Sequence, residues 1–273
     1  MLVILYIVYH SAMRIMSLLS SFQQTAKLSK LSGVGTSLVI IRSSIASRNG
    51  FSTTSMNSKA HSKSSNIWLA RQNKDPYVKK ARYENYRCRS AFKLLEINER
   101  FRVLKPGDVV VDCGAAPGSW SQVAAECVNA AGVEKRGSKG TVISVDIQSF
   151  IPVKNCITLQ QSDFTLPETR DKISQLLQGK KVDVIVSDMA PKATGIKKMD
   201  HFQIVELCRI GLKFATQVLN DGGTFVCKLW QGEDEQTLKR ELREYFDKVK
   251  PVKPNASRGD SAEMFFLCTG FKT

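Results

Sequence analysis

The chain has 273 residues, of which 42% are hydrophobic and 24% are charged, as in a soluble globular protein with one sizeable core. Its seven Cys are odd in number and irregularly spaced, which argues against a disulfide framework, a zinc site and secretion. Of its 40 Lys and Arg, nine lie in residues 1–74, where no Asp or Glu occurs. The remainder has 31 basic and 25 acidic residues, a net +6 that fits a nucleic-acid partner and an ordinary basic enzyme equally well.

Residues 1–65 are rich in Ser and contain Lys and Arg but no acidic residue. This composition is the signature of a mitochondrial or plastid transit peptide, with cleavage expected between Arg48 and Ser64. A disordered basic tail is the alternative. The apolar run Leu2–Tyr9 has eight residues, too few for a membrane span of about 20. We therefore expect a removable targeting leader, one folded domain over residues 66–273, and no membrane span.

The first predicted element of the body is a helix over Tyr86–Arg102, where apolar residues recur at helical spacing. A turn over Lys105–Asp108 precedes Val109–Asp112, an almost wholly apolar run that is typical of a buried parallel strand. A polar insert over Val133–Gly140 is expected to form a surface loop, and the next strand is predicted over Thr141–Asp146.

The same alternation continues to the end of the chain. The pattern predicts a weak strand over 155–160, a helix over 168–178, a strand over 182–188, a helix over 200–219, a turn over 221–223, a strand over 224–230, a helix over 234–248 and a strand over 263–269. Strands that alternate with helices indicate an α/β domain, in which a mostly parallel sheet is covered by helices on both faces. No internal repeat and no second domain are evident.

The segment Asp112–Trp120 joins the first strand to its helix, where open α/β sheets bind their ligands. Gly114 and Gly118 allow a tight turn and the close approach of a ligand. The loop lacks the G-x-G-x-x-G pattern, which argues against a nicotinamide oxidoreductase. A glycine-rich turn alone is weak evidence, because Gly occurs in turns of every kind.

Acidic residues follow the next three strands at their carboxyl ends. Asp146 can accept both hydroxyls of a ribose, Asp163 lies within reach of an adenine, and Asp188 ends the strand after it. Each one alone has an ordinary explanation, because Asp is favoured in turns and helix caps. Together, at one edge of the sheet, they indicate one shared ligand.

Five segments then combine into a specific pattern: RCRSAFKL at 87–94, VVDCGAAPGSWSQV at 110–123, VIVSDMAP at 184–191, FVCKLWQG at 225–232 and KPNASRGDSAEMFFLCTG at 253–270. With them the chain resembles the FtsJ/RrmJ-type 2′-O-ribose methyltransferases over roughly residues 66–272, and among these the mitochondrial members that modify large-subunit ribosomal RNA. The resemblance implies a Rossmann-like catalytic domain over residues 66–273, a seven-stranded sheet, and S-adenosyl-L-methionine as the cofactor.

Site residues carry over from this family by position. Its active-site Lys, Asp, Lys and Glu correspond to Lys93, Asp188, Lys228 and Glu263. Its cofactor contacts correspond to Gly114, Pro117, Gly118, Trp120, Asp146, Asp163 and Asp188, and no metal is expected. Two positions depart from the family pattern: Lys192 stands where Asn is usual, and Ser119 where Gly or Ala is commoner. Neither belongs to the four active-site residues.

Methyl transfer to a ribose needs alignment more than activation, because a sulfonium methyl is already reactive and the 2′-hydroxyl is a poor nucleophile. A neutral lysine can accept the hydroxyl proton, and a charged one can stabilise the developing alkoxide. Most lysines are solvated surface charges. Lys228 departs from that rule, because it lies inside the apolar run FVCKLW.

A basic stretch interleaved with tyrosines precedes the sheet: Arg71, Lys74, Lys79, Lys80, Arg82, Arg87 and Arg89, with Tyr77, Tyr83 and Tyr86. Such charges meet phosphates and such rings stack on bases, although a solvated amphipathic segment has the same composition. The resemblance implies a uridine in the A-loop of mitochondrial large-subunit rRNA, bound in the matrix within a precursor of the large ribosomal subunit. Methylation of tRNA or of mRNA caps, and RNA binding without catalysis during ribosome assembly, remain the alternatives.

Overall fold

The computed structural model describes residues 70–134 and 137–272, so the predicted leader over residues 1–65 lies outside the described residues. Seven strands form one sheet in the order β3-β2-β1-β4-β5-β7-β6. In chain order they are β1 (Val109–Cys113), β2 (Thr141–Val145), β3 (Ile157–Leu159), β4 (Val182–Ser187), β5 (Leu219–Trp230), β6 (Phe246–Val252) and β7 (Glu263–Phe271).

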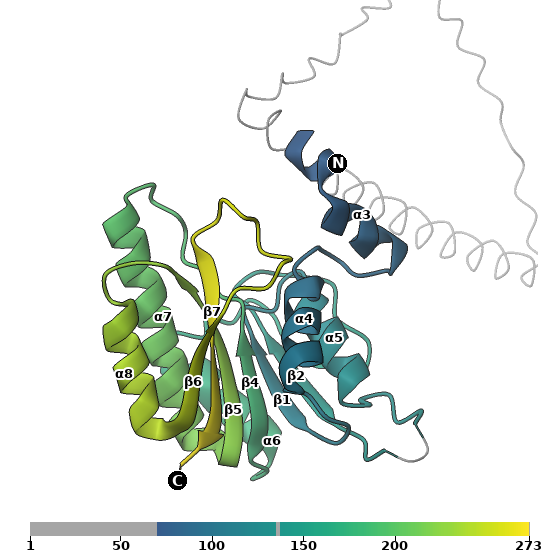
Figure 1. Ribbon diagram of the computed structural model, residues 1–273. Helices are drawn as coiled ribbons and strands as arrows, with labels where there is room; N and C mark the ends of the chain where they lie inside the picture. Colours follow the sequence, from purple (N-terminus) through teal and green to yellow (C-terminus); the bar gives the residue numbers. More distant parts are fainter. Residues whose placement is uncertain (1–69, 135–136, 273) are drawn as a thin grey trace, which may run out of the picture. The chain divides into compact units, whose positions relative to one another are not determined.

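The first five strands are parallel, and β7 lies antiparallel between β5 and β6 (Figure 1). The predicted α/β fold with a mostly parallel seven-stranded sheet is therefore confirmed. Because β7 is reversed, its first residue lies at the edge where β5 ends, and Glu263 pairs with Trp230. One edge of the sheet thus collects the carboxyl ends of the parallel strands and the start of β7.

Helices cover both faces of the sheet (Figure 1). They are α3 (Pro76–Tyr83), α4 (Ala91–Phe101), α5 (Ser119–Cys127), α6 (Pro167–Leu177), α7 (Lys197–Val218) and α8 (Glu235–Tyr245). Neighbouring strand residues point to opposite faces, so that Val110 packs with α4 and α5 while Val111 packs with α6, α7 and α8. None of the described helices has the length and apolar character needed to cross a membrane.

Three predicted boundaries need correction. The helix predicted over Tyr86–Arg102 is α4, which begins at Ala91 rather than at Tyr86. The helix predicted to reach Lys248 ends at Tyr245, and Phe246–Val252 forms strand β6 instead. Leu238, Leu242 and Phe246 are spaced four residues apart, so the apolar period of α8 continues into a strand and hides the boundary. The predicted turn over 221–223 lies within β5, where the pairing with β4 is irregular.

Candidate active site

Two glycines with positive φ shape the loop between β1 and α5. Gly114 has a φ of +79°, and a Cβ there would lie 2.6 Å from the Cγ of Met189. Gly118 has a φ of +109°, and a Cβ there would lie 2.5 Å from a guanidinium nitrogen of Arg87. The amide of Gly114 donates to the carbonyl of Val145 at 2.9 Å, which attaches the loop to the end of β2. A side chain at either glycine would displace this loop.

A pocket of about 820 Å³ lies at the carboxyl ends of β1, β2 and β4. Its lining includes four carboxylates and one ammonium group: Asp146, Asp163, Asp188, Glu206 and Lys192. We call it the acidic pocket. Gly114 and the three aspartates predicted to contact the cofactor all line it. The structure therefore brings these four predicted residues together around one cavity.

The other three predicted cofactor residues lie at the end of the loop and in the first turn of α5. Pro117, Gly118 and Trp120 are not among the described residues that line the acidic pocket. Trp120 is 2% exposed, and its indole N–H donates to the carbonyl of Ser90 at 2.8 Å. The carbonyl of Pro117 accepts a hydrogen bond from Arg87 at 2.7 Å. These residues support the loop, and their contact with a cofactor stays a prediction.

Backbone amides hold two of the pocket carboxylates in place. Asp146 accepts from the amide of Ala116 at 2.8 Å and from that of Gln148 at 2.7 Å. Asp163 accepts from the amide and the hydroxyl of Thr165 at 2.8 and 2.7 Å. Asp146 accepts one bond on each oxygen, and Asp163 accepts both bonds on Oδ1, so these contacts orient the groups without exhausting their capacity to accept hydrogen bonds.

The four predicted catalytic residues form one connected cluster, which we call the tetrad. The Nζ atom of Lys228 donates to Oδ1 of Asp188 at 2.9 Å and to its carbonyl at 2.6 Å. Lys93 Nζ lies 2.6 Å from Oε1 of Glu263 and 3.9 Å from Oδ1 of Asp188. The carboxylate of Asp188 thus lies between the two lysines, and the carboxylate of Glu263 pairs with Lys93. The side chains come from α4, β5, β7 and the residue after β4.

Burial makes the tetrad electrostatically strong. Its four side chains are only 9 to 17% exposed. Burial raises the pKa of Glu263, but the charge and hydrogen bond of Lys93, the charge of Lys228 and the hydrogen bond from Ser257 together hold that pKa below its ordinary value. Glu263 is therefore a carboxylate at neutral pH, and it keeps the ammonium group of Lys93 fixed beside Asp188.

The basic stretch before the sheet is not a uniform RNA-binding surface. Arg87 donates to the carbonyls of Pro117, Ile151 and Pro152, and burial lowers its pKa. Arg89 pairs with Asp75 and donates to a carbonyl before β7. These two arginines therefore hold the protein together. Tyr83, by contrast, is 88% exposed.

Sequence reasoning missed one contributor to the site and gave another a different role. Ser257 donates to Oε1 of Glu263 at 2.8 Å, and it lies inside the segment KPNASRGDSAEM that carried the resemblance. Arg87 connects the loop before α5 to the segment after β2, and its signal was its place beside Cys88 and Arg89 in RCRSAFKL. Among the residues that the structure describes, no group of His, Cys, Asp or Glu is arranged to hold a metal ion.

Comparison with known proteins shows which family the chain is similar to. The family model of the FtsJ-like methyltransferases matches residues 86–271. The mitochondrial rRNA methyltransferase 2 of Drosophila melanogaster is 47% identical over 216 residues, which cover 79% of this chain and 86% of that protein. The ribosomal RNA large subunit methyltransferase E of Roseobacter denitrificans is 47% identical over 209 residues, which cover 77% and 86%.

A solved structure agrees with these sequence matches. The crystal structure of a ribosomal RNA methyltransferase from Plasmodium falciparum is 31% identical and superposes with a TM-score of 0.60, covering 68% of this chain and 98% of that one. The fold, the loop after β1 and the tetrad were each predicted from residues that lie within the matched range. The chain belongs to the FtsJ-like methyltransferase family.

Proposed function

We propose that this protein transfers the methyl group of S-adenosylmethionine to the 2′-hydroxyl of a uridine in the A-loop of mitochondrial large-subunit rRNA. The observation that carries the proposal is the tetrad at the rim of the acidic pocket. The buried Nζ of Lys228 lies 2.9 Å from Asp188, a residue that also lines the pocket. A cofactor in the pocket and a ribose at Lys228 would therefore share one edge of the sheet.

The acidic pocket fits the proposed cofactor chemically. S-adenosylmethionine carries a sulfonium and an ammonium against one carboxylate, and four carboxylates against one ammonium group line the pocket. Asp146 and Asp163 both line the pocket, and Asp146 would accept the hydroxyls of the cofactor's ribose. Gly114 leaves open the space that a Cβ would fill. When bound, the cofactor supplies an activated methyl group.

The tetrad supplies positioning and proton handling. Lys228 donates to two oxygens of Asp188, which fixes its Nζ and leaves one further direction toward a substrate hydroxyl. As a neutral amine Lys228 accepts the 2′-hydroxyl proton, and as an ammonium it stabilises the alkoxide. Lys93 and Glu263 hold the ribose and set the local charge. Alignment of this kind lowers a barrier by several kcal/mol, on the order of what well-oriented reactions gain.

Support for the substrate and the compartment comes from the relatives. Both curated relatives are named as rRNA methyltransferases, one of them mitochondrial and the other specified for the large ribosomal subunit. The acid-free composition of residues 1–65 supports import into the mitochondrial matrix and a mature domain over residues 66–273. The partner is then a precursor of the large ribosomal subunit. A fusion of residues 1–65 to a fluorescent reporter tests the import signal, and a reporter that stays in the cytosol would contradict it.

The decisive test maps 2′-O-methyl groups in mitochondrial rRNA from cells with and without this protein. We expect one uridine in the A-loop of the large-subunit rRNA to lose its methyl group when the protein is absent. Purified protein should methylate an A-loop fragment in preference to tRNA and capped mRNA. Methylation of tRNA or caps instead would favour those alternatives. Complementation by a tetrad variant without methyl transfer would favour an assembly factor.

A further inference from the structure

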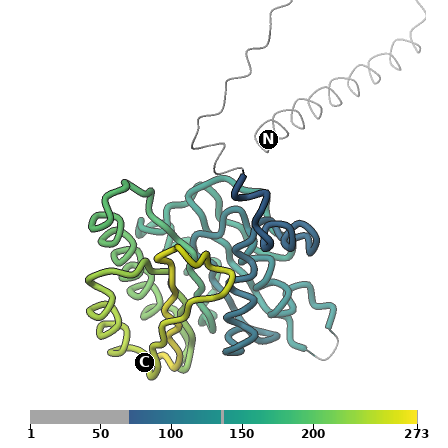
Figure 2. Tube along the Cα trace, turned by 45° about the horizontal axis from the view of Figure 1, so that its top comes forward, coloured from purple at the N-terminus to yellow at the C-terminus, as the bar shows by residue number. Residues whose placement is uncertain are grey.

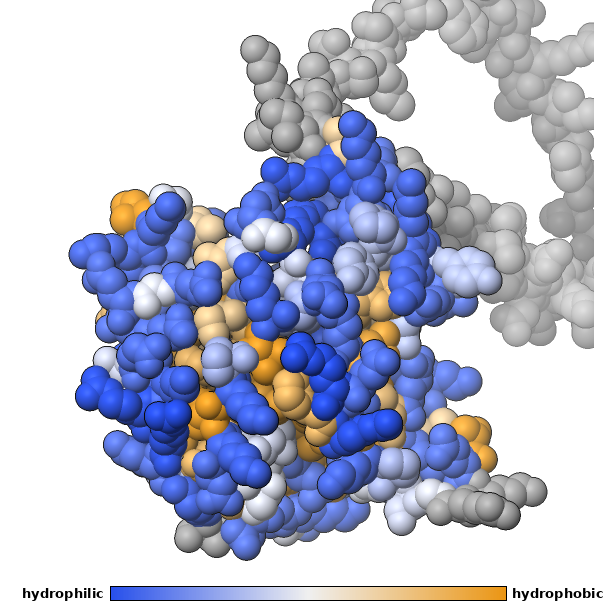
Figure 3. All heavy atoms as spheres, in the orientation of Figure 1, coloured by the Kyte–Doolittle hydropathy of each residue, from blue (hydrophilic) through white to orange (hydrophobic). Residues whose placement is uncertain are grey.

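A second hollow, of about 400 Å³, lies where the segment around α3 meets the loop between β6 and β7. Basic side chains from three separate parts of the chain line it: Arg71, Lys74, Arg89 and Arg258. We call it the basic cleft. In Figures 1 and 2 the yellow loop before β7 extends toward the blue segment around α3. Hydrophilic side chains dominate the surface around α3 in Figure 3.

The basic cleft has an excess of positive charge that the protein itself does not neutralise. Asp75 is the one acidic residue among its described lining residues, against four basic ones. Asp75 already pairs with Arg89 and lies 3.5 Å from Arg258, and its other oxygen caps α3 by accepting from the amide of Tyr77 at 3.0 Å. Arg71 and Lys74 line the cleft without an ion pair to this carboxylate, and Lys74 is exposed. The surplus charge therefore faces solvent and is available to an anion.

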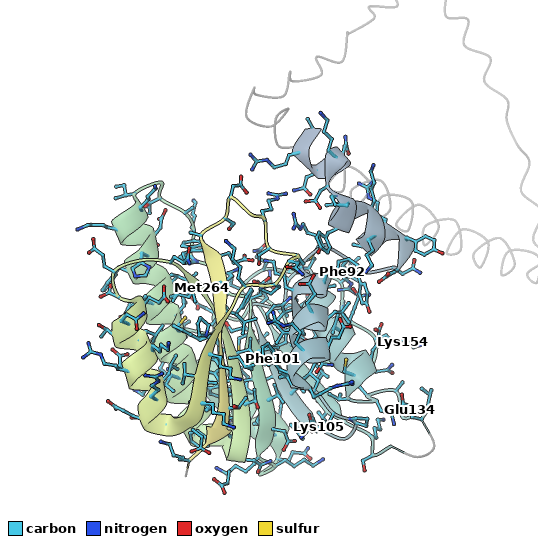
Figure 4. The ribbon with its side chains drawn as sticks, in the orientation of Figure 1. Phe92, Phe101, Lys105, Glu134, Lys154 and Met264 are labelled. Atoms are coloured by element: carbon cyan, nitrogen blue, oxygen red, sulfur yellow. The ribbon has the colours of Figure 1, made fainter. Side chains whose placement is uncertain are left out.

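The walls of the basic cleft are held firmly. Arg89 donates to the carbonyl of Ala256. Phe92, which is labelled in Figure 4, packs with Ala81 of α3 and with Ala256. The amide of Ala256 also donates to Glu96 at 3.1 Å. One further donor in this wall, the buried Nε of Arg89, has no hydrogen-bond partner within the described chain. A preformed site of this kind binds its ligand with little loss of conformational freedom.

Ser257 connects the basic cleft to the tetrad. It lines the cleft, and its hydroxyl donates to Oε1 of Glu263 at 2.8 Å. Glu263 in turn holds Lys93, whose Nζ lies 3.9 Å from Asp188 on the rim of the acidic pocket. A group bound in the cleft is therefore a few side chains away from the proposed position of the ribose.

We propose that the basic cleft binds a phosphodiester group of the RNA strand beside the nucleotide that is methylated. This inference rests on the proposed function, because it takes RNA as the substrate. An arginine guanidinium can donate two parallel hydrogen bonds to phosphate oxygens, and a lysine ammonium adds a further positive charge. Contacts to the backbone fix the register of a strand without reading its sequence. The cleft thus positions the strand, while the tetrad acts on the ribose.

The test compares two double charge reversals in the full chain. Arg71→Glu with Lys74→Glu changes the basic cleft, whereas Lys172→Glu with Lys180→Glu makes the same change in net charge at exposed positions that line neither hollow. Affinity for a synthetic A-loop stem-loop is measured over a range of KCl concentrations. We expect the cleft variant to bind at least about tenfold more weakly, with a salt slope reduced by about 0.7 for each phosphate that it no longer binds. Equal weakening by the control would overturn the proposal.

A second measurement locates the phosphate. Neutral methylphosphonate linkages replace the phosphates of the stem-loop one at a time. In the wild type, one or two linkages beside the methylated ribose should weaken binding, and in the cleft variant the same linkages should cost nothing further. If the same neutral linkage still weakens RNA binding in the cleft variant, that phosphate binds outside the basic cleft, and the proposal is overturned. If the protein methylates the stem-loop but the linkage effect is the same in the wild type and the cleft variant, phosphate binding in the basic cleft is refuted and the proposed function stands. If the linkage effect is lost in the cleft variant but the wild type does not methylate the stem-loop, the proposed function is refuted and phosphate binding in the cleft stands.

Discussion

The acidic pocket and the basic cleft have opposite charge, although one chain of contacts joins them through the tetrad. Four carboxylates and one lysine line the first, and four basic residues and one carboxylate line the second. The charges agree with a cationic cofactor on one side and a polyanionic strand on the other. At one edge of the sheet, two hollows of opposite charge are therefore connected through the same four residues.

The largest expected effect comes from a substitution of Lys228, which should change the rate of methyl transfer without changing either hollow. The Lys228→Ala variant should lose about a hundred- to ten-thousandfold in the rate of methyl transfer, because the variant lacks the amine that we propose as the contact of the 2′-hydroxyl. Cofactor and RNA affinities should stay close to those of the wild type, because both hollows keep their lining. Arginine should not rescue the rate, since a guanidinium does not give up its proton.

Single-turnover methylation of the A-loop fragment measures this effect, with the two affinities determined separately. Lys248→Ala, at an exposed position of β6, is the matched control and should leave the rate unchanged. A rate for Lys228→Ala near that of the wild type would remove Lys228 from the reaction.

The next change should affect the acidic pocket alone. Asp146→Ala removes a carboxylate that lines the pocket and holds the amide of Ala116 at 2.8 Å. Loss of hydrogen bonds to a charged group costs about 1.5–3 kcal/mol. Calorimetry should therefore show roughly ten- to hundredfold weaker binding of S-adenosylmethionine, with RNA affinity unchanged. Asp171→Ala on the exposed face of α6 is the control, and an Asp146→Ala variant with the same affinity as this control would disprove the assignment.

Arg87 distinguishes a structural arginine from an RNA-binding one. Arg87→Lys keeps the charge but cannot reach the carbonyls of Pro117, Ile151 and Pro152 together. We expect the KM for S-adenosylmethionine to rise by about tenfold, on the order of one lost charged hydrogen bond, with little change in kcat. The salt slope of RNA binding should not change, in contrast to Lys74→Ala. A lower salt slope in Arg87→Lys would show that Arg87 contacts a phosphate.

The last prediction concerns stability and not activity, as a pH dependence at Asp112, beneath the loop after β1. Burial raises the pKa of Asp112 to about 7, the hydrogen bond from Ser121 opposes this rise, and the charges of Asp188 and Asp146 add to it. Because the folded pKa exceeds the unfolded one, this carboxyl stabilises the fold fully in acid, and the contribution is lost as the pH rises toward and through about 7.

Urea unfolding between pH 4.5 and pH 8 measures this contribution. The free energy of unfolding of the wild type should fall more steeply with rising pH than that of Asp112→Asn, which has no proton to lose. Parallel pH profiles for the two proteins would show that the carboxyl of Asp112 is already ionised in the folded state.

Sequence patterns predicted those parts of the site that depend on local order. Apolar runs located the strands, and the positions of Asp146, Asp188 and Lys228 near strand ends placed them at one edge. The partners of Arg87 and Arg89 could not be predicted, because their carbonyls lie 65 and 167 residues away along the chain. Strand β6 was missed because the spacing of its first apolar residue continues the period of α8.

The reversed strand β7 also determines when the enzyme becomes complete during synthesis. It is the last strand of the chain, yet it lies between β5 and β6 and carries Glu263. A nascent chain can therefore complete neither this sheet nor its tetrad until β7 has left the ribosome. A stop codon at position 263 would remove the strand between β5 and β6 together with a predicted catalytic residue, so we expect it to act as a null allele.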